Sequence, residues 1–273
     1  KVMTQASNAY ILGTYDDELY CLGLQHQIWA SEAQLGWRKA GFTAGMNFLD
    51  LGCGPGFCAK ELAFIAGPAG SVTGIDRSAH YIDYLSQVSD IHNLKVDGIC
   101  ADFNDMELVA NVFDGMYCRW AMAWIDNPKE ILSKVYSALK PGGKMVIHEY
   151  YDWSTHQTEP SLPNLSKSIA ACLKSFKAPP GDIDVGRHMP QMLSEIGMKV
   201  TNSRLMSKLA KPNTIEWHWP KSFYLTYFPR LVEMGYLDQT TFDGTLVDLA
   251  TLEKSETSTL FCPILIEVIA EKV

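Results

Sequence analysis

The stretch NFLDLGCGPGFCAKEL, residues 47–62, decides the fold because it places three glycines and a proline between two apolar segments. Residues 46–51 form a short apolar run that stops at the glycines, which predicts a buried strand ending in a tight turn. Beyond Gly56, apolar residues recur at helical spacing until Gly67 and Pro68 end the helix. The sequence therefore predicts a strand, a glycine loop and a helix, in that order.

The rest of the chain continues this alternation of strands and helices. Further strands are expected at 71–76, 94–103, 112–125 with its exit loop, 144–153, 198–206 and 260–273, and helices at 79–90 and 128–140. Strands that alternate with helices predict an α/β fold with a parallel sheet and right-handed crossovers. Ligands in such sheets bind at the carboxyl ends of the strands.

The glycine loop lies at that carboxyl edge, where a ligand must approach the main chain. Glycine adopts positive φ and leaves no Cβ in the way. The N-terminus of the following helix favours a negative group. Asp76 lies 20 residues beyond Gly56 and ends the second strand, where an acidic side chain accepts from both hydroxyls of a ribose. These features predict a ribose-bearing ligand with a negative tail.

Composition excludes several other classes of protein. The 273 residues are 47% apolar, enough for a sizeable core, and carry a formal net charge of -8 without a basic stripe, which argues against nucleic acid as a partner. Seven cysteines without a CxxC pair predict reduced thiols and a cytoplasmic protein. No apolar run approaches 18 residues, so no membrane span is expected. We find no His, Asp and Glu set with metal-ligand spacing, and the oligomeric state is left open.

A dinucleotide-binding loop requires Gly or Ala where this chain has the bulky Phe57. The pattern DLGCGPG instead resembles the class I S-adenosylmethionine-dependent methyltransferases. The resemblance covers roughly residues 46 to 150 through four ordered motifs, FLDLGCGPG, GIDRS, CADF and LKPGGKMVIHEYYDW. It implies a Rossmann-like seven-stranded sheet with helices on both faces, and S-adenosylmethionine as the cofactor.

The resemblance also implies roles for individual residues. The glycine loop would hold the methionine part of the cofactor, Asp76 its ribose and Asp102 its adenine amino group. The full set of implied cofactor residues is Gln25, Asp50, Gly52, Cys53, Gly54, Gly56, Asp76, Arg77, Asp102, Phe103, Arg119 and Trp120. A structural alternative stays open for two of them, since Asp102 could cap a turn and Trp120 could belong to the core.

Residues 18–37 read as an amphipathic helix with Gln25 and His26 on its apolar face. This helix resembles the N-terminal cap of methyltransferases of the ubiquinone and menaquinone type, in which ExxRLxxQ is common. Glu18 and Gln25 match that spacing, but Cys21 replaces the Arg, so no ionic role is assigned to that position. A plain packing helix is the alternative.

Two insertions, at about 153–195 and 207–259, are expected to form a lid over the cofactor. The residues expected to contact the acceptor are Tyr15, Trp124, His148, Glu149 and Tyr150. The catalytic residue is left unassigned, because a general base is needed only if the acceptor is protonated. We also expect the segment 8–26 to close over the cofactor.

The sequence thus predicts one structural domain with three parts: a cap segment at 1–45, a cofactor-binding core at 46–152, and the remaining strands with lid insertions at 153–273. The predicted function is methyl transfer from S-adenosylmethionine to a small, apolar or aromatic acceptor by in-line displacement. Two alternatives remain open, a methyltransferase acting on RNA or protein, and a catalytically silent cofactor-binding protein.

Overall fold

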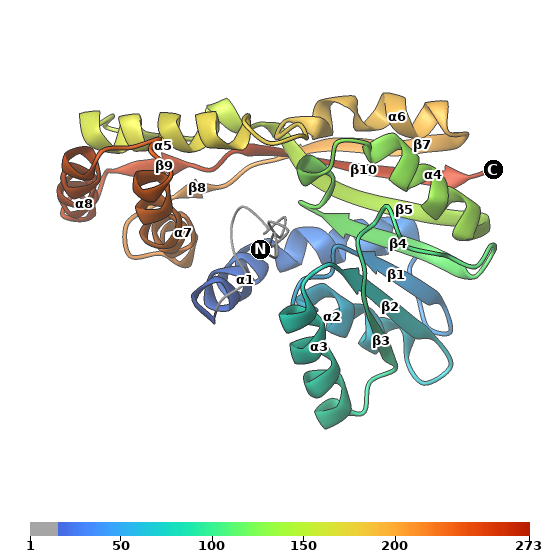
Figure 1. The fold of residues 1–273 in the computed structure, drawn as a ribbon. Coiled ribbons are helices and arrows are strands. Elements are labelled where there is room, and N and C mark those ends of the chain that lie inside the picture. The colour runs from blue at the N-terminus through green and yellow to red at the C-terminus, as the bar shows by residue number, and fades with distance from the viewer. Residues whose placement is uncertain (1–15) are drawn as a thin grey trace, which may run out of the picture.

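The computed structural model describes residues 16–273, and its centre is a seven-stranded sheet (Figure 1). The strand order is β3-β2-β1-β4-β5-β10-β7, and β10 runs antiparallel to both of its neighbours. The strands are β1 Asn47–Leu51, β2 Ser71–Asp76, β3 Val96–Cys100, β4 Phe113–Arg119, β5 Leu139–Asp152, β7 Met198–Met206 and β10 Ile264–Lys272. Because the order reverses direction between β1 and β4, their carboxyl ends open a crevice there.

Helices cover both faces of this sheet, which confirms the predicted fold class. Residues of α1, α2 and α3 share a buried cluster with one face, and residues of α4 and α6 share a cluster with the other. The bounds are α1 Asp16–Ala40, α2 Phe57–Ala66, α3 Ala79–His92, α4 Pro128–Ala138 and α6 Met189–Glu195. The site at the carboxyl edge therefore rests on a core that is packed from two sides.

The helix ends follow from local chemistry. Gly56, at φ 84°, precedes the first residue of α2, and Gly67, at φ 62°, follows its last. Ser78 caps α3 by accepting from the backbone N–H of Tyr81. Pro128 begins α4, where its missing N–H costs nothing. These signals fix the direction in which α2 and α3 leave the carboxyl edge.

The two insertions form a separate layer beside the core (Figure 1). It contains α5 Pro163–Phe176, α7 Ile215–Glu233 and α8 Gln239–Glu253, and a small antiparallel sheet in the order β6-β9-β8. The small strands are β6 Gln157–Glu159, β8 Leu209–Ala210 and β9 Thr259–Phe261. The lid helices were expected from the sequence, but the small sheet was not, because strands of two or three residues carry no readable alternation.

The helix α1 packs across the edge between the core and the insertions, and it contacts both α7 and α2. Two of its own side chains, Trp29 and Trp37, are fully buried. Residues 8–15 of the expected closing segment, including Tyr15, lie outside the described residues. Across residues 16–273 we find no helix with the length and apolarity needed to cross a membrane.

Candidate functional site

The glycine loop and Asp76 form one hydrogen-bonded unit at the carboxyl edge. Asp76 accepts from the backbone N–H of Gly54 through Oδ2 and from that of Ser78 through Oδ1, both at 2.9 Å. The loop is further tied to β2, since the N–H groups of Gly52 and Cys53 both donate to the carbonyl of Ile75. The acid and the loop expected to hold the ligand are therefore brought together.

Gly54 leaves open space where a side chain would stand. Its φ is 52°, and a Cβ built there would meet no atom within 4 Å. Gly52, at φ 74°, is different, because a Cβ there would come within 2.5 Å of the Cβ of Ala121. Gly54 thus faces a cavity, whereas Gly52 allows the loop after β4 to approach.

A cavity of about 170 Å³ lies in front of this loop. Its lining includes nine of the predicted cofactor residues, namely Gln25, Gly52, Gly54, Asp76, Arg77, Asp102, Phe103, Arg119 and Trp120. Two predicted acceptor residues, Trp124 and Tyr150, line it as well. Asp102 also accepts from the backbone N–H of Asn104 at 2.9 Å, so it caps a turn and faces the cavity at once.

A second chamber of about 70 Å³ lies behind the glycine loop and contains two unsatisfied ionic atoms. It is lined by Asp50, Cys53 and Arg119, among others. Asp50 Oδ2 and Arg119 Nη1 are buried and have no partner among residues 16–273. Burial raises the pKa of Asp50 to about 7, although the guanidinium of Arg119 opposes this shift. A ligand with both an amino and a carboxylate group would satisfy both atoms.

A third chamber, also of about 70 Å³, opens between the core and the lid. Most of its rings come from β5, α5, α7 and the segment after β5, and Trp124 comes from the loop after β4. Its lining is Gln25, Trp124, Tyr150, Trp153, His156, Phe176, Trp219, Pro220, Phe223 and Pro263. Burial lowers the pKa of His156 to about 4, so this ring is neutral at pH 7. The third chamber is therefore aromatic and uncharged.

Gln25 lies where the three chambers meet, since it lines all of them. Its Oε1 accepts from Trp219 Nε1 of α7 at 3.3 Å. The neighbouring His26 is buried and pairs with Glu61 Oε1 at 2.7 Å. Both polar side chains on the apolar face of α1 thus have partners, and the helix joins the lid to the core.

His148 and Glu149 were expected to contact the acceptor, and the structure places them elsewhere. Both side chains are fully buried and line none of the three chambers. His148 lies between Tyr117 and Glu267 on the α1 face of the sheet. Glu149 points to the opposite face, because neighbouring strand residues alternate, and it accepts from the backbone N–H of Met122 at 2.7 Å. Only Tyr150, the next residue, reaches the cavity.

Some lining residues were missed from the sequence. Tyr81 is buried, lines the main cavity and has a hydroxyl without a partner among the described residues. It lies one helical turn after Ser78, so the N-cap signal at that serine could have indicated it. His156 was missed because a single histidine in an insertion has no pattern around it.

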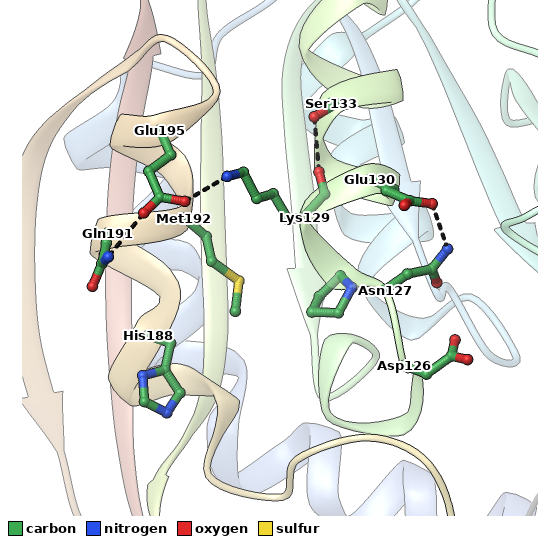
Figure 2. Close-up of a pocket in the computed structure, with 10 residues that line it drawn as sticks. Asp126, Asn127, Lys129, Glu130, Ser133, His188, Gln191, Met192 and Glu195 are labelled. Carbon is green, nitrogen blue, oxygen red and sulfur yellow. Dashed lines mark hydrogen bonds and ion pairs between the residues drawn. The ribbon is translucent and has the colours of Figure 1, made fainter.

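A larger hollow, of about 710 Å³, is a surface groove between α4 and α6 and shares no lining residue with the three chambers. Figure 2 shows Lys129 of α4 and Glu195 of α6 meeting across it, with Nζ and Oε2 2.6 Å apart. Its ends carry exposed charged side chains rather than the aromatic rings of the third chamber. We therefore take the chambers around Gln25 as the candidate site.

Comparison with known protein families shows the family of this chain. Residues 42–209, more than half of the chain, match the family described as "Methyltransferase domain". The chain belongs to this methyltransferase family. This membership confirms the resemblance stated above, and it confirms S-adenosylmethionine as the cofactor.

Individual relatives of this methyltransferase agree with the assignment. A sterol 24-C-methyltransferase of Saccharomyces cerevisiae is 26% identical over 217 residues, which is 76% of this chain and 52% of the relative. A demethylmenaquinone methyltransferase of Lactococcus lactis is 23% identical over 166 residues, 56% of this chain and 63% of the relative. The chain spans about half the length of the sterol methyltransferases that it matches.

A solved structure shows the same fold. The S-adenosylmethionine-dependent methyltransferase of Aquifex aeolicus superposes with a TM-score of 0.54 at 15% identity, covering 95% of this chain and all of the other. The chambers of this methyltransferase fit the cofactor by their own chemistry. Gly54 provides a cradle, and the unsatisfied atoms of Asp50 and Arg119 match the two charges of an amino-acid end.

Proposed function

We propose that this protein transfers the methyl group of S-adenosylmethionine to a small, uncharged aromatic or apolar acceptor. The observation that carries the proposal is the meeting of three chambers at Gln25, one ionic, one beside the glycine loop and one aromatic. The first two suit the amino-acid and nucleoside ends of the cofactor, and the third suits the acceptor.

The residues that would hold the cofactor have distinct tasks. Arg119 would bind its carboxylate, and Asp50 its amino group. Asp76 would accept from the ribose hydroxyls, and Asp102 from the adenine amino group. When bound, the cofactor supplies a methyl group on a sulfonium, which is already electrophilic. The chain therefore has to align the acceptor and exclude water, and such orientation contributes roughly 7–11 kcal/mol to the lowering of a barrier.

The aromatic chamber supports an uncharged acceptor. Within residues 16–273, no Asp, Glu, Lys or Arg lines it, and its histidine is neutral at pH 7. An anionic group such as phosphate or carboxylate would lose its hydration there without a counter-charge. The relatives named for sterol and menaquinone chemistry are in keeping with an apolar acceptor.

The proposal is tested by measuring methyl transfer from labelled cofactor to panels of uncharged aromatic and anionic acceptors. We expect turnover only with the uncharged panel. Phe176→Ala and Phe223→Ala should raise KM for the acceptor while leaving the affinity for S-adenosylhomocysteine within about threefold, because both rings line the third chamber and not the cavity beside the glycine loop. Turnover restricted to RNA or protein would contradict the proposal, as would binding of cofactor without turnover on any acceptor.

A cytoplasmic setting also stays a proposal. All seven cysteines are free thiols, and five of them are buried. Reduced thiols of this kind are typical of reducing compartments. Alkylation of the protein taken directly from its cells under non-reducing conditions tests this, and disulfide-linked species would contradict it.

A further inference from the structure

The carboxyl of Glu149 lies directly beneath the loop that follows β4. This loop contains η1 Met122–Trp124, and the backbone N–H of Met122 donates to Glu149 Oε1 at 2.7 Å. The nearby backbone N–H groups of Ala121 and Ala123 also oppose the rise that burial causes in the pKa of this carboxyl. The loop is thus tied by a backbone hydrogen bond to a side chain that is fully buried.

The loop above this carboxyl makes a strained reversal. Trp120 has φ 54°, a conformation that is uncommon for a bulky residue and costs of order 1–3 kcal/mol. Its N–H donates to the carbonyl of His148, so the chain leaves the sheet and turns back at this residue. The carboxyl of Glu149 accepts the N–H of Met122, two residues after this reversal, and so ties the loop to β5.

The reversal places aromatic rings in the cavity beside the glycine loop and in the aromatic chamber. Trp120, Ala121, Trp124 and Ile125 line the cavity in front of the glycine loop, and Trp124 also lines the aromatic chamber. The Trp120 ring stacks on Tyr150, with centroids 5.6 Å apart. The position of this loop therefore sets the shape of both the cofactor cavity and the acceptor chamber.

We propose that Glu149 is a positioning residue that holds residues 120–125 in the conformation that binds cofactor and acceptor, without touching either. This rests on the proposed function only in what the loop contacts. The hydrogen bond from Met122 to Glu149 does not depend on that function. Glu149 Oε2 has no partner among residues 16–273, so the side chain is bound to the loop through one oxygen and has no ion pair to keep.

The test compares four variants by hydrogen exchange of amides 120–125 and by calorimetric titration with S-adenosylhomocysteine. Glu149→Gln keeps an acceptor oxygen and should leave both within about threefold of wild type. Glu149→Met keeps the volume but removes the acceptor, so exchange should rise and affinity should fall by at least tenfold. Glu149→Asp withdraws the carboxyl by one methylene and should act in the same direction, which decides the matter if the Met variant does not fold.

Ile147→Ala is the matched control. Ile147 is fully buried on the same face of β5, two residues away, and belongs to none of the chambers. Its truncation should lower the free energy of unfolding while leaving exchange at 120–125 and the affinity near wild type.

Two results would overturn the proposal. One is wild-type exchange and affinity in both the Met and Asp variants. The other is a Gln variant with unchanged exchange and affinity but a hundredfold loss of turnover, which would indicate a direct chemical role. The exchange measurement needs no cofactor, so a protein that bound no cofactor would refute the proposed function and leave this test intact.

Discussion

At the scale of single residues, Gly54 shows how an absent side chain creates a site. Its Cβ position opens into the cavity, while its N–H is held by Asp76. Two separate reasons therefore favour glycine here: the left-handed φ of the backbone and the space that a ligand would occupy. A suitable control can tell them apart, because Gly45 has a similar left-handed φ of 82° and equally open surroundings outside the cavities.

We expect Gly54→Val to abolish binding of S-adenosylhomocysteine, because the branched side chain would occupy the ligand's space. Gly45→Val should pay a comparable backbone cost, on the order of 1–2 kcal/mol, and bind normally. Calorimetry for affinity and urea unfolding for stability give the two readouts. Native affinity in the Gly54 variant would show that the ligand does not approach the backbone here.

Asp76→Ala should weaken cofactor binding by roughly 1.5–3 kcal/mol, the range for a hydrogen bond to a charged group. The loss has two sources, since the carboxylate is also the acceptor for the N–H of Gly54. Asp97→Ala on the neighbouring strand β3 is the control, because Asp97 is exposed and outside the cavities. Equal affinities for the two variants in a calorimetric titration would refute the ribose assignment.

The sequence was most informative where chemistry depends on the backbone. The glycine loop, Asp76 and Asp102 could be placed because strand ends in a parallel sheet converge. His148 and Glu149 could not be placed, since alternation along a strand says that neighbours face opposite ways and not which one faces the ligand. The reversal at Trp120 was equally unpredictable, because its φ depends on contacts with β5 and Gly52 that are distant in sequence.

At the scale of elements, α1 and α7 form one boundary of the site. They are joined by the hydrogen bond from Trp219 to Gln25, and each contributes to the third chamber. The core strands β1, β4 and β5, by contrast, are each paired with a neighbour on both sides. An acceptor enclosed between these two layers can enter only if one of them shifts.

We expect S-adenosylhomocysteine to slow hydrogen exchange in residues 16–26 of α1 and in the first half of α7, in addition to the glycine loop. Trp219→Phe removes the bond to Gln25 while keeping an aromatic ring, and should reduce that added protection. Leu225→Ala, an exposed position on α7, serves as the control. Protection confined to residues 52–56 would mean that α1 packs without closing the site.

At the scale of the whole molecule, buried ionisable groups make the free energy of unfolding depend on pH, and His156 and Glu149 act in opposite directions. Burial lowers the pKa of His156 to about 4 and raises that of Glu149 to about 8. His156 binds a proton more readily when unfolded, so its contribution to stability is lost as pH falls from about 6.5 toward 4. Glu149 is the reverse case, and its contribution is lost as pH rises from about 4.5 through 8.

The free energy of unfolding should therefore fall as pH rises from 6.5 to 8.5, whereas between pH 6.5 and 4.5 the loss at His156 is opposed by the gain at Glu149 and Asp50. His156→Gln should remove a decrease of up to about 3 kcal/mol between pH 6.5 and 4. Glu149→Gln should flatten the decrease between pH 6.5 and 8.5 and leave the smaller part due to Asp50, whose pKa, raised to about 7, is passed within this range. Urea unfolding at pH 5, 6.5 and 8.5 measures both slopes. If the free energy of unfolding of both variants changed with pH as that of the wild type does, these assignments would be contradicted.

The position of β10 has a consequence for synthesis. This strand, Ile264–Lys272, lies between β5 and β7, although it follows both in the chain. Until the ribosome has released it, β5 and β7 each present an unpaired edge, and such edges invite pairing with other chains. The half of the sheet formed by β1 to β5, which includes the strands beside the glycine loop, needs no later segment for the pairing of its strands with one another. The growing chain can thus complete its cofactor-binding half early, while its sheet closes only when a strand from the last tenth of the sequence is inserted.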